Sequence, residues 1–218
     1  MNPTLVVLRK DLQLAWRDRS GWLSAFAFAA ISVLVYSFAF DLATADIRPL
    51  LPGVLWTTFL FVGIFASSQS FQRESDAGTF DAMLVAPVSP AAIYLGKVLT
   101  NLVALLVIEL ALLVVGTMLF DTALLTGELI LVVAIGTTGY VSLTTLLSTL
   151  GSRARARAVL LPVLALPLLV PLLIAGVRAT GAALGEPAGS APWLLLLTMF
   201  ALWSTLGGLL LFPLAVER

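Results

Sequence analysis

Six apolar stretches, each of about twenty residues, are the feature that most limits what this chain can fold into. They run from Gly21 to Phe40, Leu50 to Ser70, Val98 to Phe120, Leu129 to Leu150, Ala158 to Val177 and Trp193 to Leu214. An apolar helix of that length spans the hydrocarbon core of a bilayer. Only 11% of the 218 residues are charged, against about 25% in soluble proteins. The sequence therefore predicts an all-α membrane protein with six transmembrane helices. Pro162, Pro167 and Pro171 are expected to kink the fifth span, as a packed bundle tolerates.

Several classes of function are excluded by what the sequence lacks. It contains no Cys and no His, which excludes disulfides, thiol nucleophiles, zinc sites with nitrogen or sulfur ligands, and His-ligated haem within this chain. The twelve basic and twelve acidic residues cancel, so no global field attracts nucleic acid. Gly96-Lys97 lacks the rest of a phosphate-binding P-loop, so ATP would be hydrolysed elsewhere. We find no internal repeat or linker and expect residues 1–218 to form one domain.

Lys and Arg are distributed unequally between the two sides of the predicted bundle. One side holds Arg9, Lys10, Arg17, Arg19, Arg73, Lys97, Arg153, Arg155, Arg157 and Arg218. The other side holds only Arg48 and Arg178. Because cytoplasmic loops are enriched in basic residues, both termini and the segment from Phe71 to Lys97 are predicted to face the cytoplasm.

The first helix, Thr4 to Arg19, is amphipathic. Its apolar stripe is Leu5, Leu8, Leu12 and Trp16, and its polar stripe is Arg9, Gln13 and Arg17. This pattern is typical of a helix that lies in the membrane interface, and Trp16 and Arg17 stand directly before the first span. The alternative is a soluble helix that covers a partner.

The segment from Phe71 to Lys97 is the one long polar interruption. It opens with Arg73, Glu74 and Asp76 and is followed by Gly78, Thr79 and a short apolar run from Phe80 to Ala86. Thr79 suits a helix N-cap, Gly78 a sharp turn, and Asp81 the positive end of the helix dipole. Phe80, Met83 and Leu84 then share one face. Ser89 and Pro90 start the next helix as N-cap and first residue. The alternative is a solvated loop on the lipid surface.

Polar residues inside the predicted spans are the other candidate site. Glu109 lies about eleven residues into the third span, where a carboxyl group is costly unless it is paired, hydrogen-bonded or protonated. We expect either a functional role or a neutral carboxyl bonded to hydroxyls such as Thr138 or Ser142. The fourth span is rich in Ser, Thr and Gly, which favours close helix packing over a substrate path. Most of six aromatic residues lie near predicted span ends and are expected to be interfacial: Trp22, Trp56, Trp193, Trp203, Tyr36 and Tyr94.

Taken together, three segments resemble the permease half of type-2 ABC exporters. They are LRKDLQLAWRDR (Leu8–Arg19), LPGVLWTTFLFVGIFASSQSFQRESDAGTFDAMLVAPVSP (Leu51–Pro90) and ARAVLLPVLALPLLVPLLIAG (Ala156–Gly176). The acidic-Gly-Thr element is shared by that superfamily. The Pro-Gly-Val-Leu-Trp start of span two and the proline-rich span five resemble the haem exporter B subunit of cytochrome c maturation, the CcmB family. Phe80-Asp81 departs from the Leu-Glu usual there.

The resemblance implies a transporter subunit of the bacterial cytoplasmic membrane, not an enzyme. The N-terminal helix would be the elbow helix, and the segment between spans two and three would carry a cytoplasmic coupling helix that docks on an ABC ATPase resembling CcmA. Phe80, Met83 and Leu84 would fill a cleft of that ATPase, and Glu74, Asp76 and Asp81 would pair with its rim. ATP would be bound by that partner, and haem would be cargo of the complex, with no cofactor held by this chain.

A second membrane half is also implied, either another copy of the chain or a haem-handling subunit resembling CcmC. The alternative within the same class is a general type-2 exporter of drugs, lipids or glycans. An intramembrane enzyme is disfavoured because Glu109 stands alone at its depth, and hydrolytic chemistry needs at least two groups within reach. A passive assembly anchor is the third class, and it predicts that charges in the coupling helix are tolerated.

Overall fold

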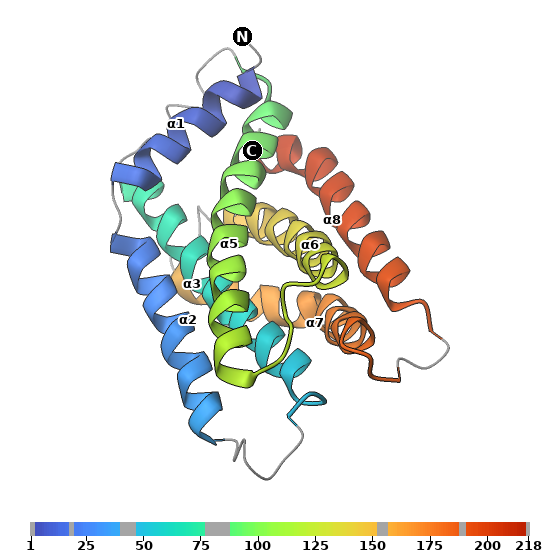
Figure 1. Ribbon diagram of the computed structural model, residues 1–218. Coiled ribbons are helices and arrows are strands. Elements are labelled where there is room, and N and C mark those ends of the chain that lie inside the picture. Colours follow the sequence, from blue (N-terminus) through green and yellow to red (C-terminus); the bar gives the residue numbers. More distant parts are fainter. Residues whose placement is uncertain are drawn as a thin grey trace.

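The computed structural model describes residues 3–17, 20–39, 47–76, 88–151, 157–187 and 191–216. Within these ranges the chain forms seven helices and no strand, which confirms the all-α class. They are α1 (Pro3–Arg17), α2 (Ser20–Ala39), α3 (Leu51–Asp76), α5 (Pro90–Phe120), α6 (Gly127–Gly151), α7 (Arg157–Ala183) and α8 (Trp193–Val216). Six of them gather into a bundle, and α1 lies across one end beside the start of α5 (Figure 1).

Each of the six predicted apolar stretches coincides with one helix of the bundle. Among the described residues, four helices are long and apolar enough to cross a membrane: Pro90–Phe120, Gly127–Thr149, Val163–Ala183 and Trp193–Val216. Leu23–Ala39 and Leu51–Ser67 are apolar but shorter. The chain is therefore a multi-pass membrane protein, and the count of six crossings stays a prediction.

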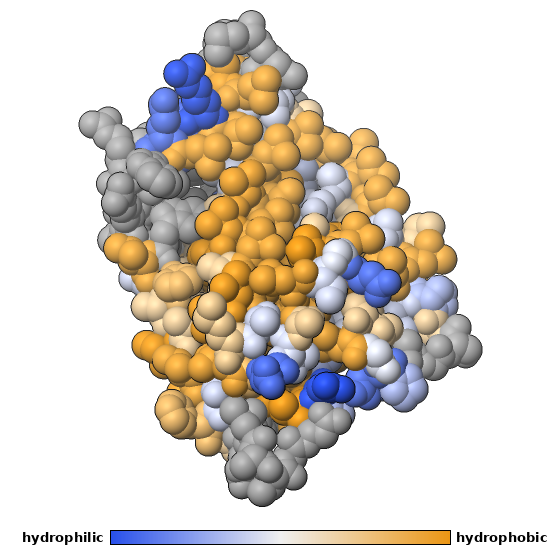
Figure 2. All heavy atoms as spheres, in the orientation of Figure 1, coloured by the Kyte–Doolittle hydropathy of each residue, from blue (hydrophilic) through white to orange (hydrophobic). Residues whose placement is uncertain are grey.

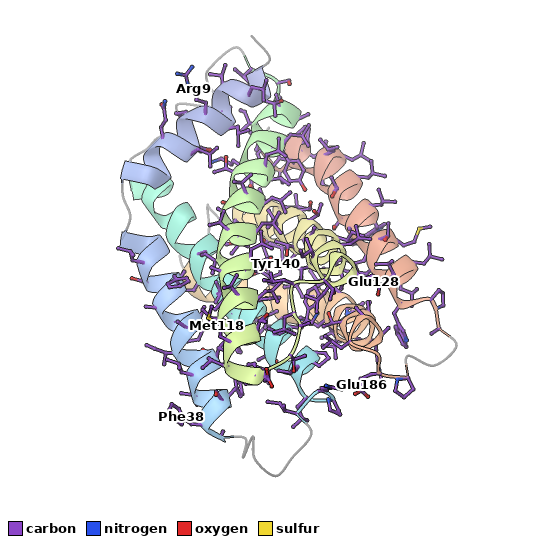
Figure 3. All side chains as sticks on the ribbon, in the orientation of Figure 1. Arg9, Phe38, Met118, Glu128, Tyr140 and Glu186 are labelled. Carbon is purple, nitrogen blue, oxygen red and sulfur yellow. The ribbon has the colours of Figure 1, made fainter. Side chains whose placement is uncertain are left out.

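The surface of the bundle is apolar between two more polar ends. Figure 2 shows orange, hydrophobic atoms over most of one face, with blue atoms near α1 and along the opposite edge. Large apolar side chains point outward, among them Phe38 at 88% and Met118 at 79% exposure. Arg9 lies at the α1 end, and Phe38 and Glu186 lie at the other (Figure 3). Such a surface suits lipid rather than water, because bilayer hydrocarbon replaces the solvent.

Three boundaries differ from the sequence prediction or refine it. Helix α3 continues past Ser70 to Asp76, because a helix needs helix-forming residues and not only apolar ones. Helix α5 begins at Pro90, and the Ser89 side chain accepts a hydrogen bond from the Ala92 amide at 3.4 Å, which confirms the predicted cap. Helix α7 runs from Arg157 to Ala183 as one helix, which includes the three prolines of the fifth span.

Helix α6 forms the centre of the bundle. It packs against α3, α5, α7 and α8 and is the most deeply buried of the four long apolar helices. Glycines allow the close approach. A Cβ on Gly139 would lie 3.1 Å from the Ala201 Cα of α8, and a Cβ on Gly136 would overlap the Trp56 ring of α3. The small residues of this span therefore serve packing, as the sequence predicts.

Gly208 of α8 gives a direct test of this packing. A Cβ there would overlap the hydroxyl and ring of Tyr94, whereas a Cβ on the neighbouring Gly207 meets nothing within 4 Å. We expect Gly208→Ala to lower the free energy of unfolding by about 1 to 3 kcal/mol, the usual cost of overpacking a core. Gly207→Ala, the matched control, should be neutral. Reversible unfolding in mixed micelles measures both, and equal values for the two variants would contradict the described packing.

Candidate functional site

The intramembrane candidate is a polar contact between α5 and α6. Glu109 of α5 is 3% exposed, and Thr137 of α6 donates a hydrogen bond from its hydroxyl to the Glu109 Oε2 atom at 2.6 Å. Glu109 stands eleven residues before the end of α5 at Phe120, roughly 16 Å along the helix. A buried carboxyl group in the apolar bundle is thus held by a hydroxyl of the central helix.

A hydroxyl of the fourth span binds Glu109, as expected, but it belongs to Thr137 and not to Thr138 or Ser142. Thr138 donates instead to the Ala134 carbonyl of its own helix at 2.7 Å. Ser142 pairs with the Thr205 hydroxyl of α8 at 2.8 Å. Successive helical residues point about 100° apart, so only the face with Thr137 is directed at Glu109.

Tyr140 completes this site one turn further along α6. Its ring lies in the middle of the bundle (Figure 3), and its hydroxyl donates to the Leu60 carbonyl of α3 at 3.3 Å. Gly63 of α3 makes room, because a Cβ there would overlap the tyrosine ring. Thr137 and Tyr140, one turn apart on α6, therefore bind α5 and α3 respectively.

Two aromatic residues expected at the interface lie in the core instead. The Trp56 indole donates to the Thr180 hydroxyl of α7 at 2.8 Å, and its ring fills the space left by Gly136 and Gly176. The Tyr94 hydroxyl donates to the Ser142 carbonyl at 3.0 Å. Each ring has a polar group with an internal partner, so neither needs interfacial water.

The described polar atoms are well satisfied. No buried side-chain nitrogen or oxygen in the ranges that the structure describes lacks a hydrogen-bond partner. The same part of the chain holds no group of three or more Asp and Glu residues placed to bind a metal ion. The arrangement is one of hydrogen bonds within and between helices, in which the Thr137 hydroxyl binds the Glu109 carboxyl group.

The candidate coupling residues are described only in part. Glu74 and Asp76 belong to the last turn of α3, and their side chains lie outside the described residues. The other six coupling positions lie wholly outside: Gly78, Thr79, Phe80, Asp81, Met83 and Leu84. Their role in coupling therefore stays a prediction.

Of the predicted interfacial residues, Lys97 is the one whose side chain the structure describes. Trp16 and Arg17 belong to the last turn of α1, with side chains outside the described part. Lys97 of α5 is 5% exposed, and its Nζ atom lies 4.0 Å from the Asp11 Oδ2 atom. Lys97 is thus buried between two helices, and its interfacial position in the membrane stays a prediction.

Sequence reasoning missed Asp11, Thr137 and Tyr140. Helical spacing carries part of the signal: Thr4, Val7 and Asp11 fall on one face of α1, and Thr137 and Tyr140 on one face of α6. The stripe of Leu5, Leu8 and Leu12 is the more apolar one, yet Leu5 is exposed and Val7 is buried. Apolar patterning cannot tell the lipid-facing side of such a helix from its protein-facing side.

These observations define a multi-pass helical membrane protein whose bundle is held together by buried polar contacts. The family model described as CcmB protein matches residues 3–217, so the chain belongs to the CcmB family. Members of that family are the membrane permease component of a haem-export ABC transporter, within the type-2 ABC permeases, and work with an ABC ATPase and other components of that system. This confirms the resemblance found in the sequence. Among curated proteins, no sequence match was found.

The Glu109 contact predicts a difference between two adjacent threonines. Thr137→Val removes the donor to Glu109, whereas Thr138→Val removes only a bond to the helix's own backbone. We expect Thr137→Val to cost roughly 1 kcal/mol of unfolding free energy, in the range measured for hydrogen bonds between membrane helices, and Thr138→Val to be near neutral. In the Glu109→Gln background, which keeps an acceptor, the cost of Thr137→Val should persist. In Glu109→Ala it should vanish; a cost that is the same in Glu109→Ala and the parent would rule the contact out.

Proposed function

We propose that this chain is the membrane permease subunit of an ABC transporter complex that exports or handles haem in cytochrome c biogenesis. The observation that carries the proposal is the family match over residues 3–217, on a helical bundle with an apolar surface. ATP hydrolysis is assigned to a cytoplasmic partner, because the sequence has no phosphate-binding loop. Haem is cargo of the complex, and any His ligand of its iron comes from another subunit because this chain has no His.

The segment between α3 and α5 is the part that would receive force from the ATPase. It joins two long helices, and the capped start of α5 at Ser89 and Pro90 follows it directly. In this proposal Phe80, Met83 and Leu84 contact an apolar cleft of the ATPase. Glu74, Asp76 and Asp81 pair with basic groups on the rim of that cleft, while Gly78 and Thr79 start the short helix.

Helix α5 would carry the movement into the membrane. It begins beside the coupling segment, and about nineteen residues later it bears Glu109, which is bonded to α6. Packed helices shift as rigid elements between discrete arrangements rather than deforming smoothly. Closure of two ATPases on ATP would therefore displace α5 against α6 and switch the bundle between inward-facing and outward-facing states.

The rest of the assembly follows from the same proposal. Six crossings place both termini on the cytoplasmic side of the bacterial cytoplasmic membrane, in agreement with the distribution of Lys and Arg. Six spans are half of the usual exporter bundle. A second membrane half is then needed, either another copy of this chain or a haem-handling C subunit.

The proposed ATPase contact is tested by placing charges on the coupling helix. Phe80→Asp and Leu84→Asp should each reduce recovery of the ATPase with the tagged chain by at least about tenfold. An unpaired carboxylate in an apolar cleft costs more than the 1.4 kcal/mol that a tenfold change represents. Cytochrome c maturation in cells should fall in parallel.

Leu125→Asp is the matched control, because Leu125 is an exposed leucine in the link between α5 and α6, away from the coupling segment. It should leave ATPase recovery unchanged. Normal recovery and normal maturation in both coupling variants would mean that the chain is a passive anchor. If the parent chain binds the ATPase but cytochrome c maturation in cells does not depend on this chain, the protein is instead a general exporter of another cargo.

A further inference from the structure

Helix α1 approaches the start of α5 unusually closely. A Cβ on Gly96 would lie 2.7 Å from the Val7 Cβ and 3.3 Å from the Thr4 carbonyl oxygen, so a side chain at this position would require α1 to shift. Val7 is buried there. The two helices are therefore in contact at the backbone level, side by side at one end of the bundle (Figure 1).

One residue further along α5, and one turn further along α1, a buried charged pair joins the same helices. Lys97 is 5% and Asp11 is 9% exposed, and their charged atoms lie 4.0 Å apart. Lys10 also contacts Asp11, at 2.9 Å, but within α1 and with 39% of its side chain exposed. Of the two cations beside Asp11, Lys97 is the buried one and belongs to the other helix, so it is the Asp11–Lys97 pair that connects α1 with α5. The close packing of Val7 on Gly96 and the Asp11–Lys97 pair therefore both hold α1 against α5.

The position of this contact along α5 gives it a meaning beyond stability. Lys97 follows Pro90, the first residue of α5, by seven residues, or roughly 10 Å of helix. The proposed ATPase-binding segment ends immediately before Ser89. Any displacement of that segment thus enters α5 within the two turns that precede the contact with α1.

We infer that Asp11 and Lys97 are positioning residues that tie α1 to the first turns of α5, so that the two helices move as one unit when the ATPase displaces the coupling segment. The inference rests on the proposed function. In it α1 is more than an interfacial anchor: its exposed apolar residues, such as Leu5 and Val6, remain in the lipid interface while α5 turns, and α1 thereby guides the direction of that movement.

The test uses the purified complex of this chain with its ATPase in lipid nanodiscs, and measures how strongly the permease stimulates ATP hydrolysis. Lys97→Met keeps the length of the side chain and removes its charge, and Asp11→Asn keeps the shape of the carboxylate. Each should lower the stimulation roughly fivefold or more, the scale of a typical coupling free energy, while the amount of bound ATPase stays constant. Arg9→Met, at an exposed position of the same helix, is the matched control and should have no effect.

An engineered disulfide separates positioning from simple stability. The sequence has no Cys, so Val7→Cys with Gly96→Cys gives the one pair that can form within the chain. The Cβ of a side chain at position 96 would lie 2.7 Å from the Val7 Cβ, about 1 Å closer than a disulfide needs, and a small shift of α1 corrects this. Oxidation should leave ATPase stimulation intact in the pair alone and should restore it in the pair combined with Lys97→Met. Reductant should reverse that rescue.

The outcomes separate the two proposals. If oxidation of the cysteine pair blocks stimulation, α1 and α5 must part during the cycle and the inference is overturned, while the proposed function stands. The same holds if Lys97→Met and Asp11→Asn stimulate as well as the parent. If the parent chain itself neither binds nor stimulates the ATPase, the proposed function falls, and the inference falls with it.

Discussion

Polar groups inside a bilayer have no water to bind, and this constraint determines how the bundle is arranged. Helix α6 is rich in hydroxyl side chains, and each must find an acceptor within the protein. Thr137 uses the Glu109 carboxyl group of α5, Tyr140 uses a carbonyl of α3, and Ser142 uses Thr205 of α8. Because these partners lie on different helices, α6 can satisfy them only from the centre. The lipid-facing helices are apolar on the outside for the same reason.

Much of the fold could be predicted from the sequence, because spanning helices leave a strong one-dimensional signal. The six apolar stretches, the Ser89 cap and the packing role of the small residues in α6 all follow from length, spacing and local chemistry. Partners across the bundle could not be predicted. The choice of Thr137 over Thr138, and the burial of Trp56 against two glycines, depend on how each helix is rotated toward its neighbours. In a chain that is apolar on nearly every face, hydrophobic patterning does not define that rotation.

Two of the buried polar contacts between the described helices share helix α5. Near its start α5 is joined to α1 by Gly96 and Lys97, and near its middle it is joined to α6 by Glu109. Each contact includes an ionisable side chain in a buried position. Burying such a side chain is costly unless its partner is correctly placed, so each contact favours one arrangement of the two helices. Such contacts add a polar constraint on how α5 can move to the constraint that apolar packing imposes. In the proposed function, α5 is for this reason the route from the coupling segment to the membrane interior.

A permease subunit of an ATPase-driven haem-handling complex should be found in native membranes together with its partners. Affinity purification of the tagged chain in mild detergent tests this most directly, with bound proteins identified by mass spectrometry and the sample scanned for a haem absorption band. We predict recovery of a cytoplasmic ABC ATPase together with a haem-containing membrane protein. Recovery of an ATPase without any haem protein would contradict the haem assignment, and recovery of no ATPase would contradict the transporter itself.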